Sequence, residues 1–139
     1  MTETGPLERR ALVVDDDAGI RLLLKRILVR HQFEVDVARD GGEALEKILA
    51  GDYAVIVLDL MMPRIDGAHV VRYLEQHRPD QLGNVIVMTA FGASALADVC
   101  PPVARHIEKP FDVNHLLNEV TETYWMSGDR YCPSKNPQH

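Results

Sequence analysis

The chain has few cysteines and no long apolar segment. Its 139 residues include two cysteines, Cys100 and Cys132, which have neither the spacing of a zinc site nor a third partner. We interpret them as reduced, incidental thiols. No stretch approaches the length of a membrane span, and the first residues lack the apolar core of a signal peptide. These absences predict a cytoplasmic protein without membrane association.

The charge balance is acidic, and the length is that of one domain. Lys and Arg number 15 against 21 Asp and Glu, which gives a formal net charge of −6. This excess argues against nonspecific binding to nucleic acid. Both ends of the chain are polar and lack apolar periodicity. We therefore expect one folded domain over residues 9–126, with flexible tails at 1–8 and 127–139.

Apolar runs alternate with segments of helical spacing. Strands are predicted at about residues 10–14, 34–38, 54–59, 84–89 and 105–108. Helices are predicted after Asp17, which is the expected N-cap of the first, from Gly42 to Leu49, after Gly67 and after Asp112. Strands that alternate with helices favour right-handed crossovers. The pattern thus predicts an α/β domain, a doubly wound five-stranded parallel sheet with helices on both faces.

The first and last predicted helices each carry an apolar stripe. The first stripe consists of Ile20, Leu23, Leu24, Ile27 and Leu28. The last consists of Val113, Leu116, Leu117, Val120 and Tyr124. Residues at this spacing share one face of a helix, so we expect both stripes to pack against the sheet.

The segment between Thr89 and Lys109 breaks the alternation. Pro101 and Pro102 prevent a helix at their positions. At most about two turns fit before them, at 3.6 residues per turn. We therefore expect the fourth helix of the alternation to be short or irregular.

Four of the apolar runs end on polar residues suited to phosphate chemistry. The first run leads into Asp15 and Asp16, the third ends on Asp59, the fourth on Thr89 and the last on Lys109. The carboxyl ends of parallel strands share one edge, where open α/β sheets bind ligands. Carboxylates, a hydroxyl and an ammonium at one edge can hold a divalent cation beside a nucleophilic aspartate.

In this order the motifs resemble the receiver domain of two-component response regulators. They are Asp15-Asp16, Asp59-Leu60-Met61-Met62-Pro63, Thr89-Ala90 and Lys109-Pro110-Phe111. The resemblance covers about residues 9–125. It implies the flavodoxin-like strand order 2-1-3-4-5, for which CheY is an example.

The resemblance implies a Mg²⁺-dependent phosphoacceptor site. Asp59 matches the residue that receives the phosphoryl group. Asp16 matches a direct ligand of the cation, and Asp15 a ligand that acts through water. The backbone carbonyl of Met61 would complete the protein's share of the ligands. Magnesium prefers such oxygen donors and retains several waters.

Three further positions take their expected roles from the same resemblance. Thr89 and Lys109 match the hydroxyl and the ammonium that contact phosphoryl oxygens. His106 stands where receivers usually carry Tyr or Phe as a switch that moves on phosphorylation. Either a switch or a surface histidine at a strand end fits this position.

The implied function is that of a stand-alone receiver. It would accept phosphoryl groups from a sensor histidine kinase or phosphotransfer protein, and a separate downstream protein would read its state. Such a domain catalyses only its own phosphorylation and dephosphorylation, so it is not a conventional enzyme. No nucleic-acid-binding module fits in the remaining residues.

Two alternatives stay open at this level. A pseudo-receiver would keep the fold but signal by protein interaction without phosphate, and His106 and the irregular fourth helix favour it. A magnesium-dependent phosphohydrolase of the haloacid dehalogenase type would need a second acid two residues after Asp59. That position is Met61, which disfavours the hydrolase.

Overall fold

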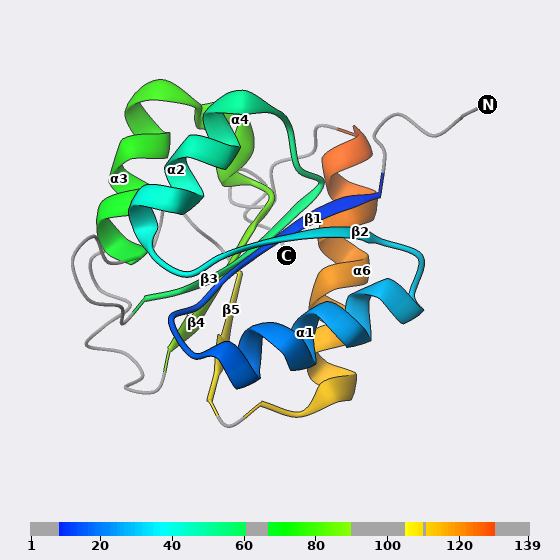
Figure 1. Cartoon of the computed structure of the whole chain (residues 1–139). Coiled ribbons are helices and arrows are strands. Elements are labelled where there is room, and N and C mark those ends of the chain that lie inside the picture. Colours follow the sequence, from blue (N-terminus) through cyan, green and yellow to red (C-terminus); the bar gives the residue numbers. More distant parts are fainter. Residues whose placement is uncertain (1–8, 61–66, 90–104, 110, 130–139) are drawn as a thin grey trace.

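A parallel five-stranded sheet lies between two layers of helices (Figure 1). The computed structural model describes residues 9–60, 67–89, 105–109 and 111–129. The strand order is β2-β1-β3-β4-β5, and every neighbouring pair is parallel. The predicted fold class and strand order are therefore confirmed. The strands are β1 (Arg10–Val14), β2 (Glu34–Ala38), β3 (Val55–Asp59), β4 (Val85–Thr89) and β5 (Arg105–Glu108).

The helices divide between the two faces of the sheet. Those that the structure describes are α1 (Ala18–Arg30), α2 (Gly41–Ala50), α3 (Gly67–His77), α4 (Pro79–Leu82) and α6 (Val113–Asp129). Helices α1 and α6 cover one face, whereas α2, α3 and α4 cover the other (Figure 1). The sequence analysis missed α4, because a single turn is too short to show an apolar period. It begins at Pro79, a residue type favoured at the first helical position.

Two apolar cores result, one on each face of the sheet. Alternate residues of β3 enter different cores: Ile56 and Leu58 pack with α2 and α3, whereas Val55 and Val57 pack with α1 and α6. Strands β3 and β4 are buried at every residue, as is typical of central strands covered on both faces.

Two predicted core residues are exposed instead. Leu23 is 46% and Val113 is 41% exposed, so the prediction that both are buried was wrong. The buried face of α1 is centred on Leu24 and Leu28. Leu23 lies about 100° around the helix from Leu24 and so projects to the side of that face. Val113 is the first residue of α6 and precedes the part of the helix that packs on the sheet, which begins at Leu116.

The ends of α1 are fixed by local hydrogen bonds. The carboxylate of Asp17 accepts from the backbone N–H groups of Gly19 and Ile20, which confirms the predicted N-cap. At the other end, Gln32 donates to Val29 and Phe33 to Leu28. This is a Schellman turn, whose left-handed residue is Gln32 with φ 75°.

Some predictions fall outside the described residues. The expected short fourth helix lies within 90–104, and the expected tails include 1–8 and 130–139. Helix α6 continues to Asp129, three residues past the predicted domain boundary. Among the helices in the described ranges, none is long and apolar enough to span a membrane.

Candidate functional site

The polar strand ends lie together at one edge of the sheet. Asp15 follows β1, Asp59 ends β3, Thr89 ends β4, and Lys109 follows β5. Asp15, Asp59 and Thr89 are buried. These three are far apart in the chain, but they occupy the carboxyl ends of adjacent strands, where α/β sheets bind ligands.

Three carboxylates form a possible metal site at this edge. Oxygens of Asp15, Asp16 and Asp59 all lie within 4.8 Å of one another. Asp15 and Asp59 are buried, whereas Asp16 is exposed and leaves the group open to solvent. Oxygen ligands at this separation suit Mg²⁺. The fourth predicted ligand, the carbonyl of Met61, lies outside the described residues.

Lys109 contacts two of these carboxylates. Its Nζ lies 3.1 Å from Asp15 Oδ2 and 3.5 Å from Asp59 Oδ2. Burial acts to lower the pKa of Lys109, but the hydrogen bond to Asp15 and the attraction to Asp59 and Asp15 outweigh it and raise the pKa above its usual value. Lys109 therefore stays charged at neutral pH.

Among the residues that the structure describes, carboxylates outnumber the cationic side chains at this site. Within the described ranges, Lys109 is the one cationic side chain in ion-pair contact with the cluster. Three carboxylates held this close repel one another, and a bound cation offsets that repulsion. The donor set and its charge thus fit a divalent cation.

Backbone contacts hold the buried carboxylate and the lysine in place. The backbone N–H of Asp17 donates to Asp15 Oδ1 at 2.9 Å. The backbone N–H of Lys109 donates to the carbonyl of Thr89 at 2.8 Å. Arg21, which the sequence analysis missed, donates from its guanidinium to the backbone carbonyl of Asp15 at 2.7 Å. No motif reveals that contact, because it depends on how α1 packs after the loop.

Gly67 is a second residue whose role the sequence analysis missed. A Cβ added there would lie 2.5 Å from the carbonyl oxygen of Asp59 and 2.7 Å from Leu60 Cα. The start of α3 can therefore approach the end of β3 only without a side chain. The backbone N–H of Gly67 donates to the carbonyl of Leu60 at 3.1 Å, which ties this approach to the strand end that carries Asp59.

Thr89 and His106 differ in their surroundings. Thr89 is buried on the strand beside β3, one residue beyond Met88, which is the register partner of Asp59. His106 is exposed on the edge strand β5, where it pairs in register with Val87. The geometry places Thr89 at the carboxyl edge with the cluster and His106 three residues before Lys109. It does not test the predicted switch role of His106.

Comparison with known proteins identifies the family. Residues 11–121 match the family model described as "Response regulator receiver domain". The chain is 35% identical to the transcriptional regulatory protein ResD of Bacillus subtilis over 138 aligned residues, which cover 93% of this chain and 55% of ResD. The chain therefore spans about half the length of this relative.

Solved structures of receivers share the fold. The receiver domain of Francisella response regulator 1452 superposes with a TM-score of 0.76 at 29% identity, covering 86% of this chain and 99% of that one. The response regulator TrrA of Thermotoga maritima, in complex with Mg²⁺ and BeF, gives a TM-score of 0.72 at 31% identity and covers 83% of this chain and 98% of its own. With the strand order, the acidic edge and the family match in agreement, the chain belongs to the receiver domain family of two-component response regulators.

Proposed function

We propose that this receiver accepts a phosphoryl group on Asp59 in a Mg²⁺-dependent reaction. The observation that supports this most is the contact of Lys109 with both Asp15 and Asp59 at the edge where the three carboxylates meet. The donor is the phosphohistidine of a sensor kinase or of a phosphotransfer protein. ResD is a regulatory protein of the same family, which supports a signalling role.

The reaction is an in-line transfer between two nucleophiles. A carboxylate oxygen of Asp59 attacks phosphorus, a P–O bond forms, and the P–N bond to the donor imidazole breaks. The electron pair of that bond stays on the ring nitrogen, which takes up a proton. Dephosphorylation is the attack of water on the acyl phosphate, which releases inorganic phosphate and restores the carboxylate.

Each residue of the site has a role in this transfer. Lys109 donates hydrogen bonds to a phosphoryl oxygen, and the hydroxyl of Thr89 donates to another. Asp15, Asp16, Asp59 and the carbonyl of Met61 would hold Mg²⁺. When bound, the cation offsets the negative charge of the phosphoryl group in a loose transition state, where positioning dominates catalysis.

The signal would pass on by a shift between two conformations of the domain. Phosphorylation biases this equilibrium, and a downstream protein reads the favoured state. Two points stay predictions. One is that His106 acts as a switch, and the other is that the receiver acts as a separate protein. Intact mass of the protein isolated from its native cells tests the latter.

Incubation with acetyl phosphate and Mg²⁺, followed by intact mass spectrometry, tests the proposed acceptor. The wild type should gain one phosphoryl group, and the gain should vanish in Asp59→Asn and in excess EDTA. Asp17→Asn is the matched control, because Asn caps a helix as well as Asp does and the residue lies beside the site. Labelling of Asp59→Asn would overturn the acceptor assignment, and an unlabelled wild type would favour the pseudo-receiver.

A further inference from the structure

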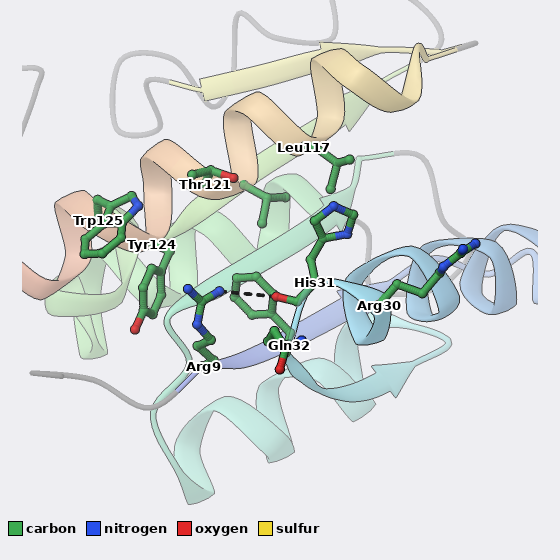
Figure 2. Close-up of a pocket in the computed structure, with 10 residues that line it drawn as sticks. Arg9, Arg30, His31, Gln32, Leu117, Thr121, Tyr124 and Trp125 are labelled. Atoms are coloured by element: carbon green, nitrogen blue, oxygen red, sulfur yellow. Dashed lines mark hydrogen bonds between the residues drawn. The ribbon is translucent and has the colours of Figure 1, made fainter. Parts of the chain in front are cut away.

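A pocket of about 410 Å³ lies at the edge of the sheet opposite Asp59. It is formed between the end of α1, the turn that follows it and the second half of α6 (Figure 2). We call it the Arg9–Trp125 pocket, after two of the residues that line it. Its size is within the range of small binding sites in proteins, roughly 300–1,000 Å³.

The charge of this pocket is opposite to that of the whole chain. Arg9, Arg30 and His31 line it, and none of its described lining residues is acidic. Across the part of the chain that the structure describes, no carboxylate lies in ion-pair contact with either arginine. A cationic hollow on a chain of net charge −6 favours an anionic ligand at this point.

Aromatic rings hold Arg9 in a fixed position. Its guanidinium carbon lies 4.6 Å from the ring centroid of Tyr124 and 5.4 Å from that of Phe33. The Nη1 group donates to the carbonyl of His31 at 3.2 Å, the bond drawn in Figure 2. A stacked guanidinium still presents N–H groups along its edge, in a fork that matches a carboxylate.

The wall of the pocket is held by local contacts. Phe33 is the last residue of the Schellman turn, and its backbone N–H donates to Leu28. Its ring packs edge to face on Tyr124, with the centroids 5.8 Å apart. A site that is ordered before binding loses little entropy on binding.

Trp125 extends the aromatic surface beyond the pocket. It is 62% exposed and packs edge to face on Tyr124, with centroids 5.4 Å apart. Single exposed apolar residues are common, but this one continues a pocket that already contains Tyr and Arg. Trp, Tyr and Arg are the residue types that contribute most binding energy in protein interfaces.

We propose that the Arg9–Trp125 pocket binds a segment of a partner protein that presents an aromatic side chain next to carboxylates. The carboxylate pairs with the guanidinium of Arg9, and Arg30 adds positive charge at the rim. The aromatic side chain packs on Tyr124 and Trp125. The exposed ring of Trp125 gives the rest of the segment a surface to lie on, which favours a polypeptide over a small molecule. This interaction is independent of phosphorylation at Asp59.

Peptide titrations followed by tryptophan fluorescence test the proposal. Trp125 is the only tryptophan in the chain, so its emission reports on the pocket alone. The probes are short peptides with one Phe and two Glu residues at varied spacings, together with versions in which Gln replaces Glu or Ala replaces Phe. Acidic aromatic peptides should give a saturable change that weakens as salt is raised. Equal binding of the Gln or the Ala versions, or no binding across the set, would overturn the proposal.

Variants separate a specific site from general attraction. Arg9→Gln should weaken binding about tenfold, as expected for the loss of a central arginine contact. Arg30→Gln should have a smaller effect, because Arg30 extends away from the aromatic rings (Figure 2). Arg26→Gln, on the exposed side of α1, is the matched control and should bind as the wild type does. Thermal melts verify that each variant is folded.

Two results would assign the pocket to something else. If Arg9→Gln is folded and binds the peptides normally, the pocket is not the site. If sedimentation shows a dimer of the free chain that Arg9→Gln abolishes, the occupant is a second copy. Loss of phosphorylation in Asp59→Asn should leave peptide affinity unchanged, so this proposal and the proposed function fail independently.

Discussion

Charged side chains are arranged differently at the two edges of the sheet. At the carboxyl edge, oxygens of Asp15, Asp16 and Asp59 lie within 4.8 Å of one another, and Lys109 contacts Asp15 and Asp59. Two of these carboxylates are buried. Negative charges are therefore crowded at this edge, where burial limits screening by water.

At the amino-terminal edge, most arginines have carboxylate partners. Arg10 pairs with Asp36 at 3.2 Å. Arg78 pairs with Asp52 and Asp80, and its hydrogen bond to Asp80 holds the pKa of that carboxyl below its usual value. These pairs are partly exposed, and they join neighbouring strands and helices.

Charged side chains with partners help to stabilise the fold, whereas crowded charges of one sign are available to a ligand. Paired ions at the surface each contribute little to stability. Excess charge of one sign costs free energy in the isolated protein and is offset when an opposite charge binds. The crowded carboxylates thus favour a bound cation, and the arginines of the Arg9–Trp125 pocket favour an anionic ligand.

Removal of the ammonium at the acidic edge should have the largest effect. Lys109→Met should lower the free energy of unfolding by about 2–3 kcal/mol in metal-free protein, since it removes an ammonium that contacts two buried carboxylates. Because the pKa of Lys109 is raised on folding, its stabilisation is complete below the unfolded pKa of about 10.4 and is lost as pH rises through the folded value.

Urea unfolding at pH 7 and at higher pH measures this effect. The difference between wild type and Lys109→Met should shrink above pH ~10.4. Lys25→Met, on the exposed side of α1, is the control and should change little. Equal stability of wild type and Lys109→Met at pH 7 would show that the Lys109 ammonium does not stabilise the buried carboxylates.

A side chain at Gly67, the first residue of α3, should have the next largest effect on stability. Gly67→Ala places a Cβ against the backbone of Asp59 and Leu60, so α3 must shift, at a cost of about 1–3 kcal/mol. Gly83→Ala is the matched control, because nothing lies within 4 Å of its added Cβ. Thermal melts of the two variants measure the difference. A small effect at Gly67 would mean that α3 is not tightly held against the site.

Neutralising one carboxylate should act in the opposite direction. Asp59→Asn should raise the stability of the metal-free protein by about 1 kcal/mol, because it removes like-charge repulsion. The contact between Lys109 and Asp15 at 3.1 Å remains. Mg²⁺ should stabilise the wild type by mass action and stabilise Asp59→Asn less. Melts of both proteins with and without Mg²⁺ measure this, and no change in either would argue against a shared acidic site.

A change among the paired charges at the amino-terminal edge should have the smallest effect. Tyr53 donates to Asp36 Oδ2 at 2.6 Å beneath the guanidinium of Arg10, so Tyr53→Phe should cost about 1 kcal/mol at pH 7. Burial, together with the hydrogen bond to Asp36 and repulsion from it, raises the pKa of Tyr53 to about 12. The stabilisation is thus complete below pH ~10 and is lost towards pH ~12. Thermal melts between pH ~10 and pH ~12 measure this effect. The melting temperature should fall less over this range in Tyr53→Phe than in the matched control Tyr73→Phe.

The sequence predicted the parts of the fold that depend on local pattern. Strand bounds agree within one residue, since each apolar run is short and ends at polar residues. The N-cap at Asp17 was predicted because capping needs only the next few backbone N–H groups. The strand order followed from family resemblance, and periodicity alone does not determine it.

Features that depend on packing between distant segments were not predictable. The exposure of Leu23 depends on how α1 is rotated on the sheet, which the apolar spacing leaves undetermined within about one residue. The need for glycine at position 67 arises from the path of β3. Arg9 lies outside every motif, and its contacts with Phe33 and Tyr124 appear only when α1 and α6 are side by side.

The length of β1 sets the spacing between the two edges. Arg9 precedes this strand and Asp15 follows it, so about 20 Å separates them at 3.3 Å per residue. A single small ligand cannot touch both sites. A phosphodonor at one end and an acidic segment at the other can therefore occupy the same molecule together, and a ternary complex is sterically allowed.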